Sequence, residues 1–376
     1  MKITIACPGR FHVGDLAREL IMLGHGVQFH SIVPTGRLER LGIPRENQNC
    51  HLGAVWPWML AQRKLPCSPA AREWLDLKVV RTLDRRYSRI RDFGDVFIGM
   101  SGLCVESLKA AKRQGAKVIL ERGSMHILDQ KEILDRLRRV SSVPSAVPNW
   151  AVERELEGYE LADVISIASR HVEDSFLHRG FDRRKLVRNP YGVDLEEFRS
   201  SPNIQKTHDV ITTGSWSLQK GSDILAEAVL KQLNLTLLHV GAVGDCKLPV
   251  HPCFTHIESI PQDQLIYQYA RANVFAMPSR QDGFGMVFSQ ALACGLPIVG
   301  SSHSGSMDLA ELLELGAPQI QSVSPGDVEG LVAAIKRAMA WLPDADAANM
   351  FAQRKPRLSW AAYGQRYHEF LINSDA

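Results

Sequence analysis

The chain has 376 residues, of which 45% are hydrophobic and 23% charged, and its formal net charge is +3. A typical domain has roughly 150 residues, so we expect two domains. This ordinary globular composition excludes a disordered chain, a collagen-like repeat and a disulfide-rich miniprotein.

Charge is unevenly distributed along the chain. The first 200 residues carry a net charge of +7 and the remainder a net charge of −4. A basic N-terminal half favours an anionic partner such as phosphates, an acidic glycan or an anionic lipid surface, although a solvated face is the alternative. The seven cysteines are scattered and form no Cys-x-x-Cys pair, so we expect a reduced cytoplasmic protein that is not secreted.

Apolar runs rich in β-formers alternate with amphipathic stretches, which is typical of βαβ units on a parallel sheet. Two sets of strands are predicted, at 3–6, 27–33, 95–99, 117–121 and 164–168, and at 210–213, 235–240, 274–277 and 297–300. Helices are predicted at 13–23, 105–114, 222–232 and 328–339.

A segment rich in Pro, Gly, Asn and Ser separates the two sets. We therefore predict an N-terminal domain at 1–190, a linker at 191–205, a C-terminal domain at 206–355 and a final segment at 356–376. Ligands bind at the carboxyl ends of strands in such sheets, so the facing strand ends predict a cleft.

The most informative segment runs from Met277 to Val287, where a strand end is followed by an acid, two glycines and a helical run. Free N–H groups over Gly285, Met286 and Val287 predict a site for an anion such as a diphosphate. Asp282 at the lip of this turn can accept hydrogen bonds from sugar hydroxyls, or it can cap the helix.

Gln290 lies eight positions after Asp282 and is expected on the same helix. Its amide can reach a ribose hydroxyl, or it is a polar residue of the core.

The run from Tyr269 to Gly305 resembles the donor-binding region of the GT-B fold retaining glycosyltransferases of family 4. That family carries Glu-Gly-Phe-Gly and a second Glu eight residues after the first. Here the four positions are Asp282, Gly283, Phe284 and Gly285, and the second Glu is replaced by Gln290.

Further segments resemble the same family. The run from Gly214 to Gly221 is similar to Gly-Arg-Leu-x-x-x-Lys-Gly, in which Arg and Lys hold the donor diphosphate; Lys220 matches, and Ser215 replaces the Arg. Residues 190–194 resemble the family's linker, and residues 8–12 stand at its N-terminal glycine turn.

The resemblance implies an α/β GT-B fold, with two Rossmann-like, doubly wound domains facing a central cleft and residues 356–376 crossing back to the N-terminal domain. It implies Asp282 and His126 as catalytic residues, with a structural role the alternative for His126. The implied donor-binding residues are Gly9, Gly214, Ser215, Lys220, Gly283, Phe284, Gly285, Met286, Val287 and Gln290, and the acceptor-side candidates are Arg10, His12 and Ser124.

The missing Arg at position 215 leaves two possibilities. A neighbour such as Arg280 or Arg10 compensates, or donor binding is weakened.

The resemblance implies an enzyme that moves a sugar from a nucleoside diphosphate sugar to a glycan or lipid-linked acceptor with retention of configuration. Neither a metal nor a cofactor is implied, and no nucleic-acid partner is expected. The alternatives are a nucleotide-sugar epimerase and a catalytically weakened protein that binds a nucleotide or sugar as the partner of another chain.

Tryptophans and arginines gather between residues 56 and 91. Trp56, Trp58 and Trp74 precede the basic run at 81–91. This pattern predicts either a surface for anionic lipid or an acceptor glycan, or core tryptophans with a solvated arginine face. A peripheral contact with the cytoplasmic membrane is therefore one of the expectations.

Overall fold

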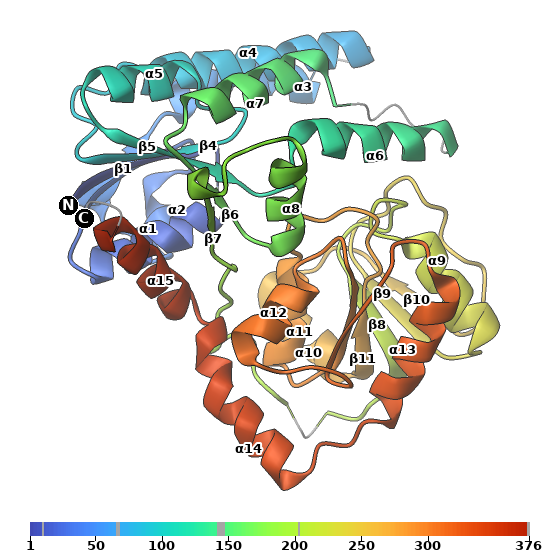
Figure 1. Cartoon of the computed structure of the whole chain (residues 1–376). Helices are drawn as coiled ribbons and strands as arrows, with labels where there is room; N and C mark the ends of the chain where they lie inside the picture. Colours follow the sequence, from blue (N-terminus) through green and yellow to red (C-terminus); the bar gives the residue numbers. More distant parts are fainter. Residues whose placement is uncertain (10, 65–67, 141–146, 202–203, 374–376) are drawn as a thin grey trace.

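The computed structural model describes residues 1–9, 11–64, 68–140, 147–201 and 204–373. It contains two parallel sheets in two lobes (Figure 1). The N-terminal sheet has the order β3-β2-β1-β4-β5-β6-β7. Its strands are β1 (Lys2–Ala6), β2 (Gly26–Ser31), β3 (Gln48–Cys50), β4 (Val96–Met100), β5 (Lys117–Arg122), β6 (Val164–Ile167) and β7 (Leu186–Arg188).

The C-terminal sheet has the order β10-β9-β8-β11-β12-β13. Its strands are β8 (His208–Thr213), β9 (Leu237–Val240), β10 (Phe254–Ile257), β11 (Ala272–Ala276), β12 (Ile298–Ser301) and β13 (Ile320–Val323). Each of the nine predicted strands has a counterpart here, whereas β3, β7, β10 and β13 were not predicted.

Helices cover both faces of each sheet. Those of the N-terminal lobe are α1 (His12–Met22), α2 (Thr35–Glu39), α3 (Leu52–Lys64), α4 (Pro69–Tyr87), α5 (Glu106–Arg113), α6 (Ile127–Val140), α7 (Asn149–Leu161) and α8 (Arg170–His178). The later ones are α9 (Ser222–Ala226), continued by a π-helix at Glu227–Gln232, then α10 (Gln262–Ala270), α11 (Met286–Ala293), α12 (Ser306–Leu313), α13 (Val328–Ala340), α14 (Ala345–Arg354) and α15 (Trp360–Asn373).

Side chains alternate between two buried layers along the central strands. Ile3 and Ile98 belong to the core cluster that includes α1 and α15, whereas Phe97 and Leu120 face the opposite cluster under α4, α5 and α7. Burial on both faces explains why these strands read as nearly continuous apolar runs.

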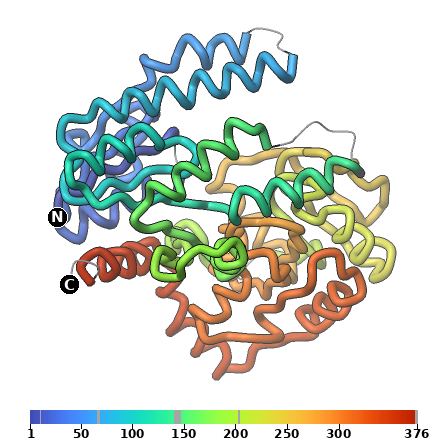
Figure 2. Tube along the Cα trace, turned by 45° about the horizontal axis from the view of Figure 1, so that its top comes forward, coloured from blue at the N-terminus to red at the C-terminus, as the bar shows by residue number. Residues whose placement is uncertain are grey.

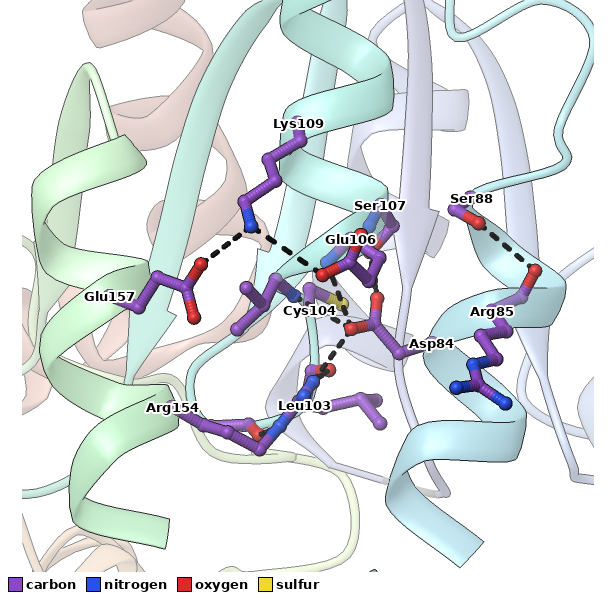
Figure 3. Close-up of polar contacts among 12 residues, drawn as sticks. Asp84, Arg85, Ser88, Leu103, Cys104, Glu106, Ser107, Lys109, Arg154 and Glu157 are labelled. Atoms are coloured by element: carbon purple, nitrogen blue, oxygen red, sulfur yellow. Dashed lines mark hydrogen bonds and ion pairs between the residues drawn. The ribbon is translucent and has the colours of Figure 1, made fainter. Parts of the chain in front are cut away.

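A buried carboxylate ties α4 to α5. Asp84 accepts hydrogen bonds from the backbone amides of Val105, Glu106 and Ser107 and from the guanidinium of Arg154 (Figure 3). The negative charge lies at the N-terminus of α5, where free amides and the helix dipole favour it.

The chain crosses between the lobes twice at one place. Val193 donates its amide to the Leu358 carbonyl at 2.8 Å, so the outgoing linker and the returning segment run together. Beyond the crossing, α15 packs against α1 of the N-terminal lobe (Figure 1), where Gly364 leaves room for Glu19.

Further contacts join the lobes. Arg188 of β7 pairs with Asp308 at 2.7 Å and with Glu311 at 3.0 Å, both on α12. The rings of His171 and His303 stack at a centroid distance of 4.6 Å.

Within the described residues, no helix has both the length and the apolar character required to cross a membrane.

Candidate functional site

A cavity of about 810 Å³ lies between the lobes at the carboxyl ends of the central strands. Loops after β1, β8 and β11 converge on it, as expected for ligand sites in doubly wound sheets. Residues of both lobes line it, among them His12, Asp15, Arg40, Gly214, Lys220, Asp282, Phe284, Gly285, Met286, Val287 and Gln290.

Lys220 and Asp282 meet inside this cavity. The Lys220 Nζ lies 2.6 Å from the Asp282 Oδ2, and both side chains are mostly buried. The two loops are held together by a backbone hydrogen bond from the Arg280 amide to the Gln219 carbonyl. A lysine and a carboxylate at one wall provide a cation for phosphate and an acceptor for hydroxyl groups.

The N-terminus of α11 opens at the same wall. The helix begins at Met286, its N-cap is Gly285, and no side chain of the described residues caps it. Gly285 has φ +80°, which is the left-handed region that favours glycine. The amides of Met286 and Val287 are therefore available to an anion.

This geometry corrects one expectation about Asp282 and excludes one alternative. The residue precedes α11 instead of lying on the same helix as Gln290, and its carboxylate pairs with Lys220 instead of capping the helix.

Gln290 is held by a short chain of hydroxyl groups. The Tyr269 hydroxyl donates to Gln290 Oε1 at 3.0 Å and lies 2.9 Å from Thr213 Oγ1. Burial raises the pKa of Tyr269, so its hydroxyl stays protonated. This hydrogen bond fixes which end of the amide is the acceptor, so the Gln290 NH₂ can donate to a ligand.

Gly283 serves the contact between the lobes. A Cβ on this residue would lie 1.8 Å from the Gly123 carbonyl oxygen, and its own carbonyl accepts a hydrogen bond from Ser169 Oγ. Gly283 is absent from the cavity lining, so the expected close approach of its backbone to a ligand is replaced by close approach to the N-terminal lobe.

Arg280 does not take the place of the arginine that is missing at position 215. Ser215 is exposed and lies outside the cavity lining. Arg280 makes a bidentate pair with Asp223, at 2.6 and 2.7 Å, and donates to the Leu218 carbonyl. Arg10 lies outside the described residues.

On the N-terminal side, His12 lines the cavity. Its Nε2 lies 2.9 Å from Glu121 Oε2, and its ring stacks on Tyr191 at a centroid distance of 4.2 Å. The other Glu121 oxygen accepts a hydrogen bond from the Tyr367 hydroxyl of α15 at 2.8 Å. A buried carboxylate therefore orients the imidazole from behind and links it to the returning helix.

His126 lies away from the cavity. Its ring packs among Tyr159, Phe176 and Phe181, with centroids between 5.1 and 5.6 Å away, and only 2% of the residue is exposed. Burial lowers its pKa to about 4. The structure corrects the expected placement, because the backbone after β5 turns this side chain into the core.

Two other predicted residues also lie outside the cavity lining. Ser124 Oγ accepts a hydrogen bond from Gln281 Nε2 at 2.7 Å and so joins the lobes. Gly9 belongs to the loop before α1.

Sequence reasoning missed Glu121, Tyr269 and Thr213. Thr213 is the last residue of β8, Glu121 is the last but one of β5, and Tyr269 is the last but one of α10. For Glu121 and Thr213, the position near the end of a strand was the signal that could have indicated a role in the site.

Comparison with known proteins gives a consistent picture. Residues 207–340 match the family described as Glycosyl transferases group 1. Over 176 residues the chain is 27% identical to GDP-mannose-dependent alpha-(1-6)-phosphatidylinositol monomannoside mannosyltransferase of Mycolicibacterium smegmatis, covering 39% of this chain and 46% of that protein. Over 223 residues it is 23% identical to D-inositol 3-phosphate glycosyltransferase of Xylanimonas cellulosilytica, covering 51% and 54%. The chain thus spans about half the length of the curated relatives it matches.

Solved structures show the same fold. Sucrose-phosphate synthase from Thermosynechococcus elongatus superposes with a TM-score of 0.63 at 16% identity, over 99% of this chain and 98% of that one. HepE of Anabaena in complex with UDP-glucose gives 0.61 at 17% identity, over 99% and 100%. The predicted α/β GT-B fold is confirmed.

Proposed function

We propose that this protein is a glycosyltransferase that moves a sugar from a nucleoside diphosphate sugar to a glycan or lipid-linked acceptor, with retention of configuration. One observation carries the proposal: Lys220 and the uncapped N-terminus of α11 converge on one wall of the cavity between the lobes. A cation beside free helix amides is suited to a diphosphate.

In this proposal the C-terminal lobe binds the donor. Lys220 and the amides of Met286 and Val287 stabilise negative charge on the departing diphosphate. Asp282 accepts hydrogen bonds from sugar hydroxyls, and the Gln290 amide donates to the ribose. Donor binding has to separate Lys220 from Asp282 in part, because the lysine is paired in the free protein.

The N-terminal lobe supplies the acceptor side. Among the described residues, His12, held by Glu121, is the histidine that lines the cavity. Besides its acceptor-side role, we assign it the catalytic role expected of His126, which lies in the core. For retention, the departing diphosphate takes the proton of the incoming hydroxyl on the same face of the sugar. The protein then has to hold the two substrates and stabilise the diphosphate, and needs neither a metal nor a cofactor.

The relatives support this assignment. The mycobacterial relative is described as GDP-mannose-dependent and acts on a phosphatidylinositol mannoside. HepE binds UDP-glucose. These names favour a hexose donor and a lipid-linked or saccharide acceptor.

The test is a donor panel with the purified chain. UDP-, GDP- and ADP-sugars are incubated with lipid and saccharide acceptors, and nucleoside diphosphate release is measured with and without EDTA. We expect acceptor-dependent release from one donor that EDTA does not abolish, and an α-linked product from an α-linked donor. Absence of transfer with any donor, or an inverted product, contradicts the proposal or its retaining mechanism.

A second candidate rests on the exposed position of Ser215 and on the Lys220–Asp282 pair. With one phosphate ligand missing and the other neutralised, the chain would bind a nucleotide and serve as the partner of another protein. Such a protein would show a nucleotide-induced rise in melting temperature without acceptor-dependent release. Conversion of the donor sugar with no acceptor present would instead indicate an epimerase.

A further inference from the structure

The α3–α4 hairpin, defined as the described residues among 52–91, forms the outer edge of the N-terminal lobe. Figures 1 and 2 show α3 and α4 side by side on the side of that lobe remote from the C-terminal lobe. The hairpin takes no part in the cavity between the lobes.

Positive charge is concentrated on this hairpin. Residues 52–91 contain nine Lys and Arg but three Asp and Glu. Of the acids, Asp84 is buried against α5 and Arg154, and Asp76 accepts a hydrogen bond from Gln62. Figure 3 shows the Asp84 carboxylate directed at α5, with the guanidinium of Arg85 turned away from it. None of the nine cations forms an ion pair with another described residue.

Three of these arginines surround a small hollow. Arg85, Arg86 and Arg89 line a cavity of about 280 Å³ together with Thr82 and Ala54 of the neighbouring helix. After burial, the charge of Arg86 is the next cause that lowers the pKa of His51, so this arginine lies near the His51 ring. Guanidinium groups beside a hydroxyl are suited to a phosphate group.

Apolar side chains are exposed on the same hairpin. Trp56 is 54%, Trp74 51% and Leu60 38% exposed. The rings of Trp74 and Trp58 meet edge to face, with their centroids 6.0 Å apart. Lys78 Nζ lies 4.9 Å from the centroid of the Trp74 ring. Exposed tryptophans among long cationic side chains are typical of surfaces at a membrane interface.

We propose that the α3–α4 hairpin docks the protein on an anionic phospholipid bilayer. Trp56, Leu60 and Trp74 enter the interfacial layer, and lipid phosphates bind at the Arg85, Arg86 and Arg89 hollow. A neutral glycan finds few free acceptors for its hydroxyl groups here, because Asp76 and Asp84, two of the three acids, already accept other hydrogen bonds.

The experiment measures vesicle binding of the full chain without donor or acceptor, so its result is independent of the proposed enzymatic function. Flotation is compared between phosphatidylcholine vesicles and vesicles that also contain phosphatidylglycerol, at low and high salt. We expect binding to the anionic vesicles that weakens with salt, because the Debye length shortens. Equal binding to both vesicles, or none to either, overturns the proposal.

Variants locate the surface. Arg86→Gln with Arg89→Gln should weaken binding about 25-fold, since each cation near an anionic leaflet contributes about fivefold. Trp56→Ser with Trp74→Ser should weaken binding at high salt as well. The matched control is Lys247→Gln with Lys336→Gln, which removes the same charge from exposed positions of the other lobe.

Two outcomes would contradict the assignment even if vesicles bind. If the control variant loses as much binding as the arginine variant, net charge and not the hairpin is responsible. If Arg86→Gln with Arg89→Gln binds the anionic vesicles as well as the unmodified chain does, the hollow is not the site of the lipid phosphates. Circular dichroism melting of each variant separates lost binding from lost folding.

Discussion

Lys220 is the residue on which the proposed donor site depends most. Its ammonium lies 2.6 Å from Asp282 Oδ2 in the free protein. This pair holds the lysine side chain in the cavity and leaves neither buried charge unpaired. A diphosphate carries more charge than the carboxylate and competes for the same cation. The Lys220–Asp282 pair thus positions the lysine for the diphosphate but lowers the affinity for the donor, because binding has to weaken the pair.

Lys220→Ala should lower donor affinity and kcat/KM by about 10- to 100-fold, because a charge-assisted hydrogen bond contributes about 1.5–3 kcal/mol. Nucleotide titration and initial rates measure this. Lys220→Arg should retain part of the activity, and Lys336→Ala, at an exposed position on α13, should retain all of it. Full activity of Lys220→Ala would remove the lysine from the mechanism.

Tyr269 orients Gln290 through one hydrogen bond and is itself buried. Tyr269→Phe should raise the KM for the donor by about fivefold, since a neutral hydrogen bond contributes about 1 kcal/mol. Donor saturation curves test this. A change in kcat with an unchanged KM would show that Gln290 acts on the reacting groups instead of the bound nucleotide.

The loop from 282 to 285 illustrates how one element serves two purposes. Its middle, Gly283, presses against Gly123 of the other lobe, whereas its end, Gly285, starts α11 in a left-handed conformation. The contact between the lobes therefore fixes the position of the anion-binding helix end.

Gly283→Ala should separate the lobes, because the added Cβ would lie 1.8 Å from the Gly123 carbonyl oxygen. We expect a loss of about 1–3 kcal/mol in the free energy of unfolding, as for overpacking elsewhere, together with lower kcat/KM. Denaturant unfolding and initial rates measure both. Gly316→Ala is the matched control, since no atom lies within 4 Å of its added Cβ; equal behaviour of the two variants would refute the steric argument.

The central strands of each sheet could be predicted from the sequence, whereas the edge strands could not. The four strands that escaped prediction, β3, β7, β10 and β13, are the edge strands and have three or four residues each. Such short segments carry too little periodicity to be distinguished from loops, and their pairing partner is set by tertiary structure. The central strands, buried on both faces, were predicted because their apolar runs are long.

The parts of the site that could be predicted are those whose residues lie close together in the sequence. The 282–287 segment and Lys220 were identified because a strand, a turn and a helix start are contiguous. The His12–Glu121–Tyr367 chain joins residues 109 and 246 positions apart, so no local pattern indicates it. His126 was misplaced because a strand end indicates the right edge of a sheet but not the direction of each side chain beyond it.

The whole molecule contains several histidines that burial keeps neutral. Burial lowers the pKa of His30 to about 3 and those of His126, His171 and His239 to about 4, with a neighbouring histidine adding to the effect at His30, His171 and His239. As the pH falls, these histidines take up a proton near pH 6.5 in the unfolded chain but only near their lowered pKa values in the folded chain. Stability is therefore complete above that pH and is lost as the pH falls toward 4.

Melting temperatures between pH 7 and pH 5 should accordingly decrease with acid. His126→Phe should reduce the dependence by about one proton, because a phenyl ring fits the aromatic cluster and does not titrate. His178→Gln, at an exposed position, should leave the dependence unchanged. A melting temperature independent of pH over this range would show that the histidines titrate normally in the folded chain.

A crystal structure with a bound nucleoside diphosphate tests the proposed donor site most directly. We predict that the diphosphate lies against the amides of Met286 and Val287 at the start of α11, with the Lys220 ammonium turned from Asp282 toward a phosphate oxygen. A nucleotide bound elsewhere, with Lys220 still paired to Asp282, would contradict it.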